Sequence, residues 1–187
     1  MLLIFISAIA PAQTQPLLLR FDPALTRAEI SLSATLHTVH GKFQLKHGEF
    51  RFDPATGAIS GEIVFDATTG RTGNDRRDNK MHKTVLESAR FPEIVFQPHR
   101  VEGVVAASGT SSVQVHGTFS LHGTDHEVAL PVEVQFQPGS WSASARFPVP
   151  YVQWGLKNPS SAFLHVSDSV EVELHAEGKV SSIASAP

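Results

Sequence analysis

A two-residue alternation of apolar and polar side chains runs through most of this chain. It is clear around Ile30, Leu32 and Ala34, which alternate with polar residues. Because successive side chains of a β-strand point to opposite faces, this period indicates strands with one buried face. The same period recurs in further segments, at 39–45, 59–65, 113–121, 128–136, 141–147 and 170–176. Less regular strands are expected at 93–97 and 100–105, so the sequence predicts an all-β chain.

Short turn signals separate these segments. Asp53–Gly57, Gly123–Asp125 and Pro138–Gly139 contain residues suited to tight reversals. Such short connections predict hairpins and therefore an antiparallel sheet. The apolar phase slips at His47 and Gly48, which indicates either a β-bulge or another turn.

One segment has a helical period instead. Met81, Val85 and Ala89 recur at every fourth residue, and Asn74 is suited to cap the first turn. We therefore expect one helix from Asn74 to Ser88. A meander of about eight strands with one inserted helix predicts a closed or nearly closed barrel, because closure removes exposed strand edges.

The inward face of this barrel is expected to be apolar. It consists of Val, Ile, Leu and Phe, interspersed with small residues at Gly41, Gly61, Gly117, Ala143 and Ala145. These small residues either leave volume unfilled or allow a curved sheet to pack, in which case the core is solid. An interior ligand must be mostly hydrocarbon, and each methylene that it buries contributes about 0.8 kcal/mol.

We predict that large residues on the inward parity, on the helical stripe and in one irregular segment contact this ligand. They are Phe43, Phe65, Met81, Val85, Phe96, Phe119, Phe136, Trp141, Phe147 and Trp154. Trp154 belongs to the irregular segment and either lines the mouth of the pocket or covers one end of the barrel.

Composition excludes several other functions. The formal charge of −3 is scattered along the chain, so nucleic acid is not an expected partner. The absence of cysteine excludes disulfides and thiolate chemistry. The sequence does not indicate the oligomeric state.

Histidine pairs do not make a convincing metal site. His37 and His40 are three residues apart, which places them on opposite faces of a strand, and His122 and His126 flank a turn. There is also no GxSxG nucleophile motif. We therefore expect no metal, no cofactor and no enzymatic activity.

A charged cluster precedes the helical stripe. Arg76, Arg77 and Asp78 form either an ion-pair network at the helix start or a contact for the head of a ligand, and the network is favoured.

The N-terminus predicts export. Leu2–Ala10 is a short apolar run, followed by the small-x-small pattern Ala10-Pro11-Ala12. We expect a signal peptide at residues 1–12, a single mature domain at 13–187, and a periplasmic or secreted protein. The run has about half of the roughly 20 residues that span a bilayer, so stable membrane insertion is not expected.

Several segments together resemble the YceI-like family of bacterial lipid- or polyisoprenoid-binding proteins. The matching segments are 37–43, 48–53, 72–78, 91–96, 115–123 and 166–170. The family's motif positions correspond to Gly41, Phe43, Gly73, Asn74, Arg77 and Asp78. The chain departs from the family by a shorter link at 36–40 and lacks an Asn-Arg-Ser/Thr type of element near 152–155.

The resemblance implies an extended antiparallel lipocalin-like barrel that holds a long isoprenoid or isoprenyl quinone, usually after export. The expected function is therefore lipid binding. One alternative is a structural or stress-related module with a solid barrel. The other is an enzyme that uses histidines at the barrel mouth.

Overall fold

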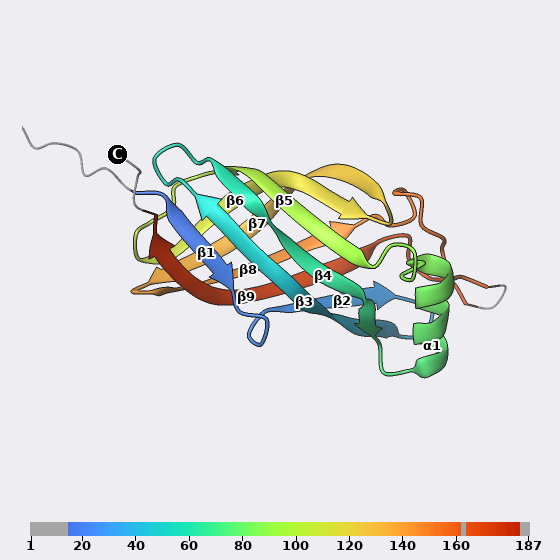
Figure 1. Ribbon diagram of the computed structural model, residues 1–187. Coiled ribbons are helices and arrows are strands. Elements are labelled where there is room, and N and C mark those ends of the chain that lie inside the picture. Colours follow the sequence, from blue (N-terminus) through green and yellow to red (C-terminus); the bar gives the residue numbers. More distant parts are fainter. Residues whose placement is uncertain (1–14, 162–163, 184–187) are drawn as a thin grey trace, which may run out of the picture.

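Nine antiparallel strands curl into a barrel in the computed structural model, which describes residues 15–161 and 164–183 (Figure 1). The predicted signal peptide at 1–12 lies outside the described residues. The strands are β1 (Leu17–Phe21), β2 (Arg27–Ser33), β3 (Thr38–Phe52), β4 (Ile59–Arg71), β5 (Glu93–Glu102), β6 (Gly109–Leu121), β7 (Thr124–Gln137), β8 (Ser140–Val149) and β9 (Val170–Ser182). The predicted all-β antiparallel barrel is confirmed.

The barrel closes because β3 pairs with both β2 and β4. The strands β1 and β2 share one position in the wall, between β3 and β9: β2 pairs with residues 38–44 of β3, and β1 pairs with residues 49–52. Nine strands therefore fill eight positions around the barrel. β1 was not among the predicted strands, because its sequence shows no alternation.

Two irregularities in strand pairing explain where the apolar period slips. The register between β3 and β4 shifts between Leu45 and His47, so this slip is a bulge inside one long strand and not a turn. The predicted short strands at 93–97 and 100–105 form one strand, β5, which ends at Glu102, so the predicted extension to 105 is wrong. The register of β5 shifts between Pro98 and Arg100. Pro98 has no N–H to donate to the ladder, which is why the pairing breaks there.

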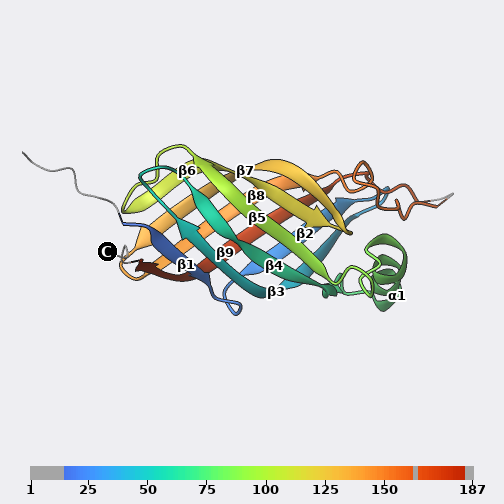
Figure 2. The same ribbon diagram turned by 45° about the horizontal axis from the view of Figure 1, so that its top comes forward.

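A short helical segment covers one end of the barrel (Figures 1 and 2). It consists of α1 (Asp75–Lys80) and η1 (Met81–Val85), a wider π-helical turn. As predicted, Asn74 caps it, since its side-chain oxygen accepts a hydrogen bond of 3.0 Å from the Arg77 N–H. The predicted extension to Ser88 is wrong. Glu87 has φ of 45°, which ends the helical geometry and leaves Ala89 exposed outside it.

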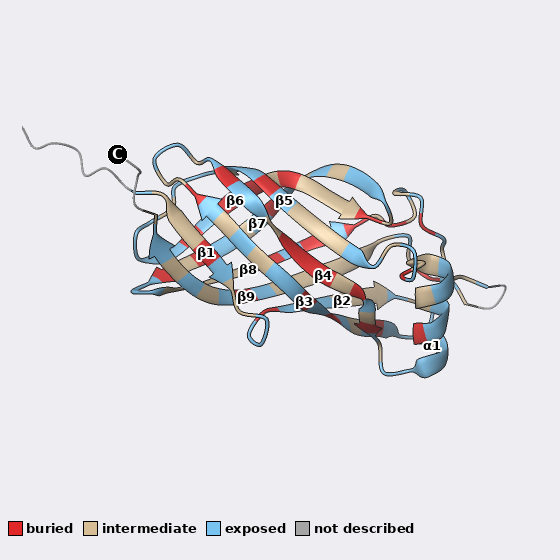
Figure 3. Cartoon of the chain, in the orientation of Figure 1, coloured by how far each residue is buried: buried red, intermediate tan, exposed pale blue. Residues whose placement is uncertain are grey.

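The two ends of the barrel contain separate clusters of buried apolar residues, and buried positions are red in Figure 3. At the end away from the helix, buried side chains form one close-packed cluster around Phe52, Ile59 and Trp141. Two further clusters lie at the helix end, and half-buried apolar residues pack against all three clusters, among them Leu32, Phe119 and Val172 at the helix end. Throughout 15–161 and 164–183, no helix is long and apolar enough to cross a membrane.

The three glycines expected on the inward face, Gly41, Gly61 and Gly117, allow close packing and do not leave space. A Cβ atom at Gly117 would lie 2.5 Å from the Gln97 carbonyl oxygen and 2.8 Å from the Phe96 ring, so this glycine makes room for that ring. Gly61 was expected to face inward, but it is exposed. A Cβ atom there would lie 2.1 Å from the Glu49 carbonyl oxygen, so the close approach of two strands requires glycine.

Candidate functional site: an apolar cavity at the helix end

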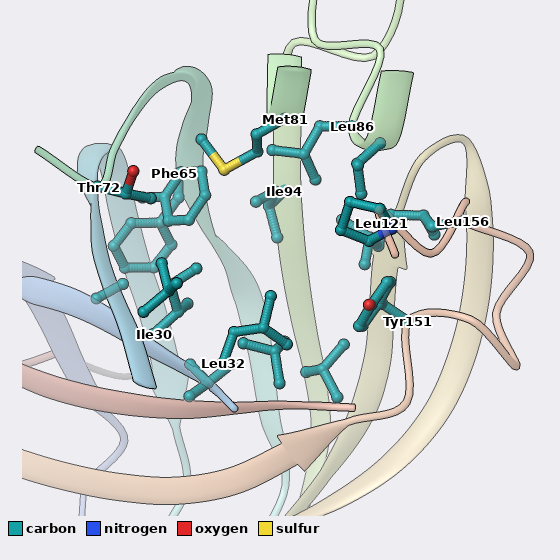
Figure 4. A pocket seen from close by; sticks show the side chains of 18 of the residues that line it. Ile30, Leu32, Phe65, Thr72, Met81, Leu86, Ile94, Leu121, Tyr151 and Leu156 are labelled. Atoms are coloured by element: carbon teal, nitrogen blue, oxygen red, sulfur yellow. The ribbon is translucent and has the colours of Figure 1, made fainter. Parts of the chain in front are cut away.

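The helix end of the barrel contains a cavity of about 470 Å³. Figure 4 shows Met81 and Leu86 entering it from the helical segment, opposite Ile30 and Leu32 of β2. Its volume lies within the roughly 300–1,000 Å³ that is usual for pockets that hold one small molecule. Many of the half-buried residues of the helix-end core, among them Leu32, Phe119 and Val172, line this space, so the core surrounds a cavity there.

The wall deep in the cavity is apolar. Its strand residues come mainly from β2, β4, β5, β6 and β9, in keeping with the inward parity of each strand. They include Ala28, Ile30, Leu32, Ile63, Phe65, Ile94, Phe96, Phe119, Leu121, Val170, Val172 and Leu174. The polar and charged residues of the lining, Tyr151 aside, belong to the segments around the mouth: His37, Thr72, Asn74, Arg76, Arg77 and Lys80. This arrangement suits a ligand with a hydrocarbon body.

Tyr151 is the one phenol of the chain and its hydroxyl is already bonded. It donates a hydrogen bond of 2.7 Å to the Ser167 carbonyl oxygen. Burial, and then the negative charge of Asp168, raise the pKa of Tyr151 to about 12. The phenol therefore stays neutral at ordinary pH and adds no charge to the wall.

Seven of the ten residues predicted to contact the ligand line the cavity together. They are Phe43, Phe65, Met81, Val85, Phe96, Phe119 and Phe147. Phe136 and Trp141 lie elsewhere, in the close-packed end of the barrel, where they border a smaller cavity of about 100 Å³. Trp154 lines neither cavity. The Trp154 ring stacks on the His126 ring with 4.0 Å between the centroids. It also contacts Phe119, which does line the large cavity, with 5.6 Å between the ring centroids.

Other lining residues were missed by the sequence reasoning. Leu32 and Val172 share the inward parity that identified the phenylalanines, so the alternation could have found them. Leu156 and Val166 come from the irregular stretch between β8 and β9, which has no period to indicate which side chains turn inward.

The charged cluster at the helix start ties the helical segment to the end of β4. The buried carboxylate of Asp78 accepts hydrogen bonds from the Thr72 N–H, at 2.9 Å, and from the Thr72 hydroxyl. Arg77 donates to the Thr72 hydroxyl oxygen at 2.7 Å and to its carbonyl oxygen at 2.8 Å. The cluster is therefore a structural network of hydrogen bonds through Thr72, without the predicted ion pairs in the described part of the chain, and it also places the Arg77 side chain on the cavity lining.

The histidines considered as metal ligands are dispersed. His37 lies at the mouth, His40 contacts the Ser31 hydroxyl, and His122 pairs with Glu87 at 2.7 Å. In the part of the chain that the structure describes, no group of three or more His, Asp or Glu side chains is placed to hold a metal ion.

Comparison with known proteins gives a consistent picture. The sequence profile of the YceI-like domain matches residues 19–178. A UPF0312 protein of Vibrio cholerae serotype O1 is 23% identical over 143 residues, which cover 75% of this chain and 74% of that protein.

Solved structures share the fold at low sequence identity. BcnA of Burkholderia cenocepacia has a TM-score of 0.72 at 16% identity, and the match covers 84% of this chain and 99% of BcnA. A polyisoprenoid binding domain from Saccharophagus degradans has a TM-score of 0.69 at 17% identity, with 86% and 97% covered. The YceI protein of Campylobacter jejuni has a TM-score of 0.63 at 17% identity, with 78% and 86% covered.

Proposed function

This chain belongs to the YceI-like domain family, and on that basis we propose that it binds an apolar lipid, of the isoprenoid or isoprenyl-quinone type, inside its barrel. The observation that carries the proposal is the cavity of about 470 Å³, whose deep wall is apolar and whose charged residues surround the mouth. A polyisoprenoid binding domain with the same fold supports the choice of ligand class. The proposed role is binding and not catalysis.

The arrangement of the lining gives the ligand an orientation. A polar head buried deep in the barrel would lose its hydrogen bonds to water, at a cost of a few kcal/mol. At the mouth, Arg76 and Lys80 are exposed and water is present to solvate a head group. The hydrocarbon chain therefore lies inside, and the head lies beside the helical segment.

Mass spectrometry of the intact protein tests this function. Protein purified without detergent is expected to carry an adduct that is released on denaturation and extracts into organic solvent. Protein stripped of this adduct should bind geranylgeraniol in a one-to-one complex. Protein that carries no adduct and takes up no geranylgeraniol would contradict the proposal.

We also propose that the protein acts outside the cytoplasm, as a single mature domain at 13–187. The support is the apolar run and the Ala10-Pro11-Ala12 pattern near the N-terminus. Cell fractionation and N-terminal sequencing test it. A periplasmic or secreted chain that begins at Gln13 is expected, and an unprocessed cytoplasmic chain would contradict it.

A further inference from the structure

The barrel contains a second, smaller cavity in line with the first. It has a volume of about 100 Å³ and lies in the close-packed end, bordered by Phe52, Phe136 and Trp141. Its lining is also apolar, apart from Ser144. The two cavities lie one behind the other along the inside of the same strands, since β5, β7, β8 and β9 contribute to both linings.

A single layer of side chains separates the two cavities. Four residues line both of them: Ile63, Phe96, Leu130 and Leu174. They come from four different strands, β4, β5, β7 and β9, so they meet from several sides of the barrel interior. We call these four residues the dividing layer.

Phe96 is the member of the dividing layer with the widest contacts. It packs against all three clusters of the core, the close-packed one and the two around the large cavity. Its ring occupies the space that Gly117 leaves free, where a Cβ atom would lie 2.8 Å from two ring carbons. A side chain held in this way has little freedom to swing aside for a ligand.

We propose that the dividing layer sets the greatest length of hydrocarbon chain that the barrel accepts, with Phe96 as the principal stop. This inference rests on the proposed lipid-binding function and adds a specificity to it. A chain that enters at the mouth gains contacts with the apolar wall until its end reaches the layer. Further carbons have no space beyond it and stay at the mouth, in contact with water.

The ligand class that follows is a lipid of limited chain length. Each additional methylene that enters the cavity should tighten binding by roughly fourfold. Once the end of the chain meets the dividing layer, this gain should cease. Affinity is therefore expected to rise with chain length to a definite limit and not beyond it.

A competition experiment measures this limit. Ligand-free protein is equilibrated with an equimolar mixture of all-trans prenols of two to six isoprene units, and the occupancy of each is read by native mass spectrometry. In the unaltered protein, occupancy should increase with the number of isoprene units up to a limiting chain length, and should not increase for longer prenols. Phe96→Ala should move the limit by at least one isoprene unit, because it joins the two cavities.

Two further variants keep the experiment decisive. Leu174→Ala opens the same layer with a smaller loss of packing, and it serves if Phe96→Ala does not fold. Val134→Ala is the matched control, because Val134 lines only the small cavity and its truncation leaves the layer intact. The control should have the same limiting chain length as the unaltered protein.

The results separate the two proposals. If prenols bind but the limit is the same in the folded layer variants, or moves equally in Val134→Ala, the dividing layer is not the stop and this inference alone is overturned. If neither the unaltered protein nor any variant binds a prenol, the proposed function is overturned and this inference with it.

Discussion

Lys80 reaches from the helical segment to Pro159, where its ammonium group donates a hydrogen bond of 2.8 Å to the backbone carbonyl. Both residues are part of the cavity lining. The bond therefore joins two sides of the mouth, the helical segment and the stretch between β8 and β9. Any ligand that enters or leaves at this end passes a rim that the bond holds together.

Loss of this bond should speed ligand exchange. An exposed hydrogen bond of this kind contributes about 1 kcal/mol, so Lys80→Met is expected to raise the dissociation rate of geranylgeraniol about fivefold, with little change in the free energy of unfolding. Stopped-flow displacement measures the rate. Lys83→Met, an exposed lysine on the same segment, is the control and should leave the rate unchanged. Equal rates in both variants would show that the bond does not restrain exchange.

Filling the large cavity should block binding without unfolding the barrel. Val172 lines this cavity and not the smaller one, so the ring in Val172→Phe has space to occupy. We expect binding of geranylgeraniol to weaken at least tenfold, while the urea midpoint stays near that of the unaltered protein. Val64→Phe places the same ring at a buried valine that lines neither cavity, and it should cost about 1–3 kcal/mol of stability through overpacking. A Val172→Phe protein that loses stability to the same extent would indicate a packed interior at that position.

Removal of the Asp78 carboxylate should loosen the helical segment. Asp78→Ala leaves the N–H and the hydroxyl group of Thr72 without this acceptor, at an expected cost of about 1.5–3 kcal/mol in urea unfolding. Hydrogen exchange of residues 75–85 should increase. Asp75→Ala removes an exposed carboxylate from the same turn and should lower the free energy of unfolding by a smaller amount. Similar losses in the two variants would contradict the role given to the buried carboxylate.

Stability should fall at high pH because of Tyr151. Its pKa is raised from 10.0 to about 12 in the folded chain, so the unfolded chain loses the phenolic proton first as the pH rises. The contribution of Tyr151 to the free energy of unfolding is complete below pH 10 and is lost as the pH rises through about 12. Since this is the only tyrosine, tyrosinate absorbance near 295 nm follows it directly. A midpoint near 10 in the folded protein would refute the buried, bonded phenol, and Tyr151→Phe should abolish the signal.

The sequence predicts the face of each strand better than the depth at which a residue lies. Alternation correctly turns Phe43 and Phe119 toward the large cavity. The same parity also selects Phe136 and Trp141, which lie in the close-packed end, because parity does not say how far along the barrel a residue is. A bulky substitution at Ala143 would therefore probe the smaller cavity and not the larger one.

Segments without a period could not be predicted. Tyr151 and Leu156 line the cavity from the irregular stretch after β8, where only tertiary contacts determine which side chains turn inward. The helix end was misplaced for a related reason. The stripe of Met81 and Val85 continues to Ala89 in the sequence, yet Glu87 takes a left-handed conformation that a pattern of apolar residues does not reveal.

The sharing of one wall position by β1 and β2 has a consequence for the order of folding. Both strands pair with β9, the last strand of the chain, so neither can complete its ladder until residues 170–182 have been synthesised. Pairings between the two ends of the chain form slowly, because a long loop must close first. The barrel therefore cannot close before β9 has been synthesised, and its closure joins β1 and β2 to β9.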